Sequence, residues 1–276
     1  MEKILVTTDF STNSKAGIRF AIQLASQTNS ELIFYNVIQI LKPTVWSVLK
    51  WNNYAAEEID KHQKKLKKFI QAIYKTSNLA EPNYKCVSEV ATEVDEQIVS
   101  FAKKIKANYI CMSTKGAGNI QKIFGTNASA LITSSPIPVV VVPHTYRIKP
   151  ITSIWYASDF ENLKPELTAV TKFNQELQAH LNITHYYMAN IFEDRKKTET
   201  IIAKNQSEKV QFNSIKRNIG YSLVQQIQKD VKKLKPSLLV LFTKQNRSWF
   251  ERWFLSSKTA ELTFDLKTPM LVFRKK

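Results

Sequence analysis

The chain repeats one pattern of short apolar segments, and this repeat limits the possible folds more than any other feature. The run KILVTTDF at residues 3–10 and the run IWYASDF at residues 154–160 both end in Asp-Phe. A second block follows in each half, at residues 109–142 and 238–273, and closes with a proline and an apolar run. Matching landmarks at a nearly constant offset indicate a duplicated domain.

Strand-like and helix-like segments alternate in both halves. In the first half we expect strands at 3–8, 32–38, 84–90, 109–112 and 139–142, with helices at 55–75, 94–106 and 126–134. A further helix carries Ile18, Ala21, Ile22 and Ala25, and Ser11 or Thr12 is its expected N-cap. The second half predicts strands at 154–157, 183–189, 209–213, 238–242 and 270–273, and helices near 164–180, 220–234 and 257–265.

This alternation predicts an α/β fold in which two tandem, doubly wound parallel-sheet domains follow each other. We expect domains at residues 1–146 and 151–276, joined by a linker around Pro143–Pro150. The valine run at 139–142 would form a flat sheet edge, and the run at 270–273 would form a similar one. Mutual protection of these edges predicts that the domains pack together as a pseudo-dimer.

Charge and composition restrict the function classes. The net charge is +17, with 18 basic and 11 acidic residues in 1–147 and 22 basic and 12 acidic residues in 148–276. The positive electrostatic field of this charge attracts polyanions and nucleotides, but a high net charge also keeps a protein soluble.

We see no signal peptide, spanning segment or disulfide framework, which predicts a cytoplasmic protein that does not bind membranes. We expect Cys111 to be buried, and His180 and His185 to be surface residues outside any metal site.

One group of residues predicts anion binding in the first half. Ligands of parallel α/β sheets bind beyond the carboxyl ends of the strands, where Asp9 and the segment 113–116 are expected. Gly116, Gly118 and Gly125 would let backbone N–H groups approach a phosphate, and Thr126 begins the following helix. Lys115 and Lys122 would add positive charge. The alternative for Gly116 and Gly118 is a tight turn, and the alternative for Gly125 is a break at the start of the helix.

These blocks resemble the universal stress protein family, and the resemblance covers the whole chain as a tandem pair. The residues that carry it are Ile4 to Ser11, Met112 to Gly116, Gly125-Thr126 and Pro136 to Val139. It implies a Rossmann-like fold of the adenine nucleotide alpha hydrolase type, with ATP or AMP as ligand and Mg²⁺ as a candidate companion. The resemblance places adenine near Thr8, Asp9 and Val37, and the phosphates on the loop from Ser113 through Gly116 to Gly125, Thr126 and Asn127. Met112, Lys115 and Gly118 complete the predicted set of nucleotide-binding residues.

The sequence departs from the family signature, which reads Gly, two residues, Gly, nine residues, Gly and Ser or Thr. Ser113 replaces the first glycine, and eight residues separate Gly116 from Gly125. One missing residue shifts the phosphate donors by about 3 Å. In the second half the signature aligns with Thr243, Asn246, Ser256 and Ser257, so every glycine is lost. We therefore expect the second site to be degenerate.

We find no catalytic constellation, so the leading hypothesis is a non-enzymatic, regulatory, nucleotide-binding stress protein. Its first domain would bind the nucleotide, and an unidentified protein would recognise the bound state. The rival hypothesis is an interaction module without a nucleotide, whose basic and aromatic surface contacts a protein or polyanion. We do not expect nucleic-acid binding, because that hypothesis rests on charge alone. Pairing of two chains into a homodimer stays open.

Overall fold

The computed structural model describes residues 1–77, 79–80, 83–114, 126–187, 200, 203, 209–243 and 267–275. The chain divides into two compact units, Met1–Lys149 and Pro150–Lys276, which we call unit 1 and unit 2. Both are α/β units, as the alternating sequence pattern predicts. The packing of the two units as a pseudo-dimer stays a prediction.

Unit 1 forms a parallel sheet with strand order β3-β2-β1-β4-β5. Its strands are β1 (Glu2–Thr7), β2 (Ser30–Gln39), β3 (Tyr84–Ala91), β4 (Tyr109–Ser113) and β5 (Val139–Val142). Its helices are α1 (Lys15–Gln27), α2 (Val48–Lys75), α3 (Val94–Lys104) and α4 (Thr126–Ser134). The strand pairs that the structure describes in this unit are all parallel, with Ile4 opposite Leu32 on one side and Tyr109 on the other.

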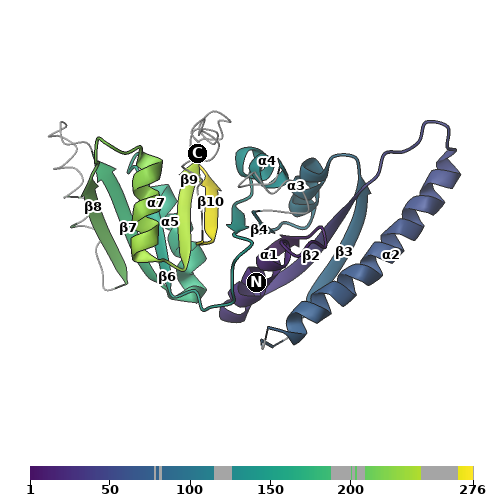
Figure 1. Cartoon of the computed structure of the whole chain (residues 1–276), viewed down its shortest axis with the longest axis horizontal. Helices are drawn as coiled ribbons and strands as arrows, with labels where there is room; N and C mark the ends of the chain where they lie inside the picture. The colour runs from purple at the N-terminus through teal and green to yellow at the C-terminus, as the bar shows by residue number, and fades with distance from the viewer. Residues whose placement is uncertain are drawn as a thin grey trace. The chain divides into compact units, whose positions relative to one another are not determined.

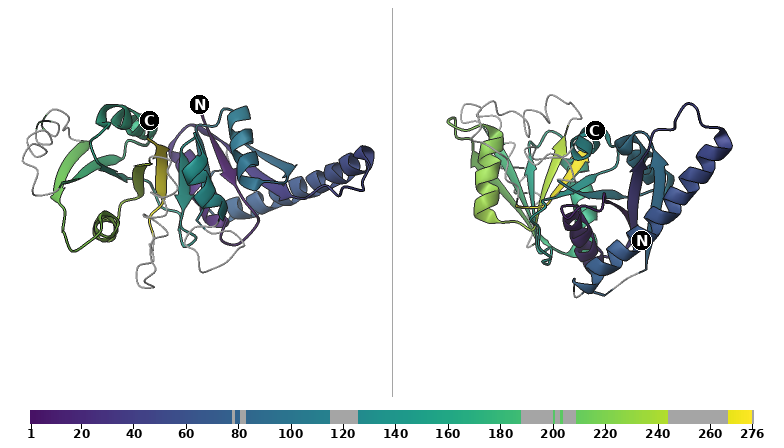
Figure 2. Two further views of the ribbon diagram at one scale, coloured as in Figure 1. Left: turned by 90° about the horizontal axis from the view of Figure 1, so that it is seen from above. Right: turned by 45° about the vertical axis from the view of Figure 1, so that its right-hand side comes forward.

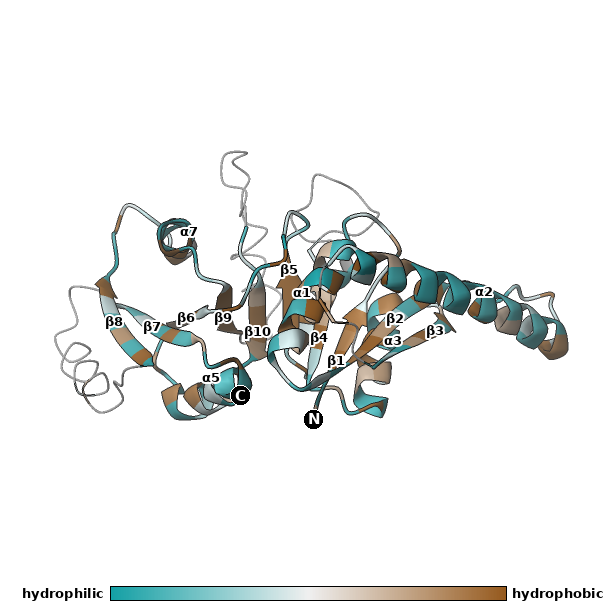
Figure 3. Cartoon of the chain, turned by 90° about the horizontal axis from the view of Figure 1, so that it is seen from below, coloured by the Kyte–Doolittle hydropathy of each residue, from teal (hydrophilic) through white to brown (hydrophobic). Residues whose placement is uncertain are grey.

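The sequence explains the layers of this unit (Figures 1 and 2). The central strands are nearly uninterrupted runs of buried apolar residues, because helices cover both faces of a parallel sheet. Right-handed crossovers place α1 and α2 on one face and α3 and α4 on the other. Contacts between α1 and α2 and between α3 and α4 agree with this placement. Figure 3 colours the central strands brown and much of α2 teal.

Unit 2 repeats this topology with strand order β10-β9-β6-β7-β8. Its strands are β6 (Ser153–Ser158), β7 (His180–Tyr187), β8 (Val210–Lys216), β9 (Leu238–Thr243) and β10 (Met270–Arg274). The described helices of this unit include α5 (Leu163–Leu177) and α7 (Leu223–Leu234), whose N-cap Ser222 forms a capping box with Gln225. Strand β6 lies between β7 and β9, as β1 lies between β2 and β4.

The duplication extends to unusual backbone conformations. Phe10 and Phe160, which follow the two repeated Asp residues, have φ angles of 63° and 61°. Lys106 and Lys235, each just before the fourth strand of its unit, have φ angles of 55° and 47°. Positive φ angles are uncommon outside glycine, so their recurrence at matching places supports a common origin of the two units.

Some local predictions were wrong. Helix α1 begins at Lys15 with Ser14 as its N-cap, not Ser11 or Thr12, because residues 8–14 form an extra turn before the helix. Helix α2 begins at Val48, earlier than expected. His185 is buried, since its ring stacks on Phe160 at 4.5 Å, whereas His180 is exposed as predicted. The predicted helix 257–265 lies outside the described residues.

Candidate functional site

The strand order of unit 1 creates a crevice at the carboxyl ends of β1 and β4. After β1 the chain turns to α1 on one face, and the chain that follows β4 leads to α4 on the other. This divergence of neighbouring parallel strands is the place where open α/β sheets bind ligands. The register pairs Val6 with Cys111, so Asp9 and Ser113 follow at the same edge of the sheet. The structure therefore brings these two predicted site residues to one edge.

A hydrogen-bonded turn presents Asp9 at this edge. Its Oδ1 accepts from the N–H of Ser11 at 3.0 Å, and its side chain is exposed. Thr8 is buried, and its hydroxyl pairs with that of Ser14 at 2.8 Å and accepts from the N–H of Phe10 at 3.1 Å. The Thr8 side chain therefore holds the turn on which the exposed Asp9 lies.

The start of the predicted phosphate segment is fixed by a close helix–strand contact. A Cβ atom on Gly17 of α1 would lie 2.9 Å from the carbonyl carbon of Met112 and 2.9 Å from the nitrogen of Ser113. The Cys111 thiol also lies 3.4 Å from the Gly17 carbonyl, to which it can donate. Only glycine lets α1 approach the end of β4 this closely.

The structure describes some of the remaining predicted site residues, and the others lie outside the described ranges. Met112 and Ser113 end β4 as buried residues, and the Ser113 hydroxyl donates to the Val142 carbonyl at 3.2 Å. Val37 is half-buried in β2, and Asn127 is exposed in the first turn of α4. Thr126 begins α4, as expected for a helix that follows a phosphate loop. Lys115, Gly116, Gly118, Lys122 and Gly125 lie outside the described residues.

Asn36 brings an unsatisfied acceptor to the same edge. Its side-chain amide donates to the Thr8 carbonyl at 2.9 Å, which fixes the orientation of the amide. Its Oδ1 is buried and has no hydrogen-bond partner among the described residues. An unpaired buried acceptor costs about 1–3 kcal/mol, so a donor at this position would stabilise the site.

The equivalent crevice of unit 2 contains an internal cation. Asp159 occupies the place of Asp9, with its Oδ1 accepting from the N–H of Glu161 at 3.1 Å. The ammonium group of Lys275, whose side chain is 4% exposed, pairs with Asp159 and lies 2.9 Å from Glu161. Burial lowers the pKa of Lys275, but the two carboxylates outweigh it and raise the pKa overall. His144 follows Pro138 at the same spacing as Lys275 follows Pro269, so it is the residue of unit 1 that matches Lys275. His144 is exposed.

A buried carboxyl group lies behind this ion pair. Glu166 in the first turn of α5 accepts a hydrogen bond from the Tyr156 hydroxyl, and its Oε1 has no partner among the described residues. Burial raises the pKa of Glu166 above its ordinary value, although the bond from Tyr156 acts in the opposite direction. Among the described residues, this edge of unit 2 therefore carries a cation paired with two carboxylates and, behind it, a buried carboxyl group.

This environment predicts a pH-dependent effect of Glu166→Gln. A carboxyl group whose pKa is higher in the folded than in the unfolded state makes its full contribution to stability at pH values below its unfolded-state pKa. This contribution is lost as the pH rises through the folded-state pKa. Glutamine keeps an acceptor for Tyr156 but cannot ionise. Between about pH 4 and pH 7 the free energy of unfolding of the variant should therefore fall less than that of the wild type, as urea titrations at each pH would measure. An equal pH dependence in both proteins would contradict this assignment.

Three features of the two crevices could not be predicted from the sequence. The close contact of Gly17 depends on which strand lies beside α1, and the role of Lys275 depends on the return of β10 to the site. Asn36 looked like an ordinary strand residue. Within the described ranges no group of three or more His, Cys, Asp or Glu could hold a metal ion. No described helix is both long and apolar enough to cross a bilayer.

Comparisons with known proteins agree with this geometry. The model of the universal stress protein family matches residues 1–143. A universal stress protein from Archaeoglobus fulgidus has the same fold, with 15% identity, 99% of this chain and 98% of that chain covered, and a TM-score of 0.63. A functionally unknown protein from Pseudomonas aeruginosa follows, with 15% identity, 99% and 92% covered, and a TM-score of 0.60. A search of curated proteins found no match. At this identity the structural likeness shows the fold alone.

Proposed function

Because the chain belongs to the universal stress protein family, we propose that unit 1 binds an adenine nucleotide, ATP or AMP, and that unit 2 does not. The nucleotide serves as a regulatory ligand and not as a substrate. Its binding shifts the population of conformations that a protein partner recognises. Mg²⁺ would accompany the nucleotide through its phosphates.

The observation that carries this proposal is the position of Asp9 at the divergence of β1 and β4. The exposed carboxylate can accept from the adenine amino group or from a ribose hydroxyl. The close packing of Gly17 supports the proposal by holding the backbone of Ser113 beside it. Asn36 adds a buried acceptor at the neighbouring strand end, where a ligand donor or water would satisfy it.

The electrostatics of the two crevices favour a single site per chain. In unit 2 the buried Lys275 ammonium pairs with the half-exposed Asp159 carboxylate, so this aspartate already has a cationic partner within the chain. The second unit also lacks glycine between residues 243 and 257, where backbone N–H groups would approach phosphate.

Calorimetric titration of ATP and AMP into the full chain, at moderate and at high salt, tests this function. We expect one nucleotide per chain, with an affinity that changes little with salt because pocket contacts dominate it. Binding that disappears at high salt would indicate attraction by the +17 charge alone. That result, or the absence of binding, would favour the interaction module over the nucleotide-binding protein.

A further inference from the structure

The connection between β2 and α2, together with the first turns of α2, exposes a run of aliphatic side chains. They are Leu41, Val45, Val48 and Leu49, with exposed fractions of 71%, 88%, 65% and 71%. We call residues 41–54 the α2 tip. Among the described residues, the other exposed large hydrophobic side chains are Met1, Ile219, Tyr221 and Leu234. Single exposed apolar residues are normal, but a run of them marks a surface that contacts a partner or a membrane.

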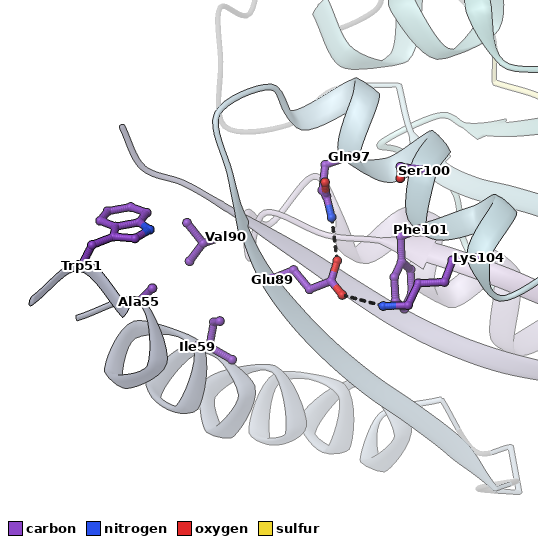
Figure 4. A pocket seen from close by; sticks show the side chains of 9 residues that line it. All are labelled: Trp51, Ala55, Ile59, Glu89, Val90, Gln97, Ser100, Phe101 and Lys104. Atoms are coloured by element: carbon purple, nitrogen blue, oxygen red, sulfur yellow. Dashed lines mark hydrogen bonds and ion pairs between the residues drawn. The ribbon is translucent and has the colours of Figure 1, made fainter. Parts of the chain in front are cut away.

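The α2 tip lies beyond the core of unit 1. The buried residues of α2 all belong to its second half: Leu66, Ile70, Ile73 and Tyr74. Figures 1 and 3 show the first half projecting past the strands of this unit. On its inner side, Ala55 and Ile59 face β3 across a pocket of about 450 Å³ (Figure 4). The aliphatic side chains of the α2 tip therefore contribute little to the core of unit 1.

Three aromatic residues accompany the aliphatic ones. The rings of Trp46 and Tyr54 pack edge to face with centroids 5.1 Å apart, and the Trp51 ring lies 6.5 Å from that of Trp46. All three residues are half-buried. Tryptophan and tyrosine are enriched where a membrane meets water, because each combines an apolar ring with a polar N–H or O–H group. The composition of the α2 tip is therefore typical of a surface that enters a membrane interface.

Charge favours an anionic lipid surface over a protein at this position. Lys42 and Lys50 are exposed, and the α2 tip contains no acidic residue. The Lys50 ammonium lies 4.8 Å from the centroid of the Trp46 ring. Lysine is depleted in interfaces between proteins. At a membrane, its charge is attracted by anionic lipids while its aliphatic stem covers apolar surface. The net charge of +17 acts in the same direction.

We propose that the α2 tip binds the surface of an anionic lipid bilayer. The four exposed aliphatic side chains enter the boundary between headgroups and acyl chains, and Lys42 and Lys50 contact the headgroups. Such peripheral binding needs no spanning helix, and none occurs among the described helices. The proposal departs from the expectation that the protein does not bind membranes, because the sequence alone did not reveal that these apolar residues are exposed.

Flotation of the full chain with vesicles of equal parts phosphatidylcholine and phosphatidylserine tests this proposal. The wild type should bind, and Val48→Ser/Leu49→Ser should weaken binding by about tenfold or more, because two apolar side chains no longer leave water. Leu41→Ser/Val45→Ser lies outside α2 and should have the same effect. Wild-type affinity in both variants would overturn the proposal.

A control variant in unit 2 shows whether the loss is specific to the α2 tip. Ile219→Ser/Leu234→Ser also replaces two exposed aliphatic side chains and should leave vesicle binding unchanged. Circular dichroism should show equal helix content in the wild type and in the serine variants. A loss of binding in the control as large as that in the tip variants would contradict the assignment to the α2 tip.

Matched lysine variants separate the α2 tip from general attraction by the net charge. Lys42→Gln/Lys50→Gln should weaken binding strongly, because each lysine near an anionic surface contributes about fivefold in affinity. Lys67→Gln/Lys68→Gln removes the same charge from exposed positions in the second half of α2 and should have a smaller effect. Equal losses in both variants would overturn the proposal, since they would indicate attraction by the whole +17 charge.

Tryptophan fluorescence locates the contact. Phospholipids with brominated acyl chains should quench the fluorescence of the wild type, and Trp46→Phe/Trp51→Phe should remove most of this quenching while the protein stays bound. Undiminished quenching in that variant would place the contact elsewhere and overturn the proposal. Sedimentation velocity covers the other occupant. A dimer that is lost in Val48→Ser/Leu49→Ser, without vesicle binding by the wild type, would overturn the proposal and assign the surface to a second copy of the chain.

Discussion

Replacement of Gly17 by alanine should destabilise the protein, although alanine is the better helix former. In an exposed helix this change would stabilise by about 1 kcal/mol. Here the new Cβ would lie 2.9 Å from two backbone atoms of β4, which cannot move aside as a flexible side chain could. Overpacking of this kind costs about 1–3 kcal/mol, so the free energy of unfolding should fall.

Gly220→Ala is the matched control for this change. Its Cβ would lie 3.3 Å from the side-chain oxygen of Asn218, and the residue has no positive φ angle. We expect a change within about 0.5 kcal/mol in urea-induced unfolding. Gly17→Ala should also weaken ATP binding, since a displaced α1 or β4 moves the backbone of Ser113. Equal stability of both variants would contradict the close contact.

Loss of the Asp9 charge should weaken ATP binding, whereas loss of the matching charge in unit 2 should not. Asp9→Asn keeps an acceptor for the N–H of Ser11, so the turn is preserved. A hydrogen bond to a charged group contributes about 1.5–3 kcal/mol, which corresponds to an affinity about 10- to 100-fold weaker. Calorimetric titration of ATP would measure the change.

Asp159→Asn is the control within the same chain. It should leave ATP affinity unchanged but lower the stability of unit 2, because Lys275 loses part of its charge compensation. The two variants therefore separate binding from stability. Equal losses of ATP affinity in both variants would contradict the single site in unit 1.

The sequence predicted the architecture well because local periodicity and the repeat determine it. Strands such as Val139–Val142 and helices such as Val94–Lys104 follow directly from apolar spacing. Boundaries were less accurate where polar turns compete for the same residues. The Ser11 hydroxyl accepts from the N–H of Ser14, as an N-cap side chain does, but this bond closes a separate turn and α1 itself begins at Lys15.

The candidate site was predictable only in part. Asp9 and Ser113 were both expected after the carboxyl ends of strands, and the order of the parallel strands brings these two ends side by side. The contributions of Gly17, Asn36 and Lys275 depend on contacts between segments up to 116 residues apart, which no local pattern encodes. His185 was predicted to be exposed, but stacking on Phe160 buries it.

Hydrogen–deuterium exchange of the full chain, with and without saturating ATP, locates the nucleotide most directly. Ligand binding should slow exchange where it stabilises the backbone. We expect protection in peptides that cover residues 7–14 and 109–127, and none in peptides that cover residues 156–163 and 238–243. Protection at the second pair, or at neither pair, would contradict nucleotide binding by unit 1 alone.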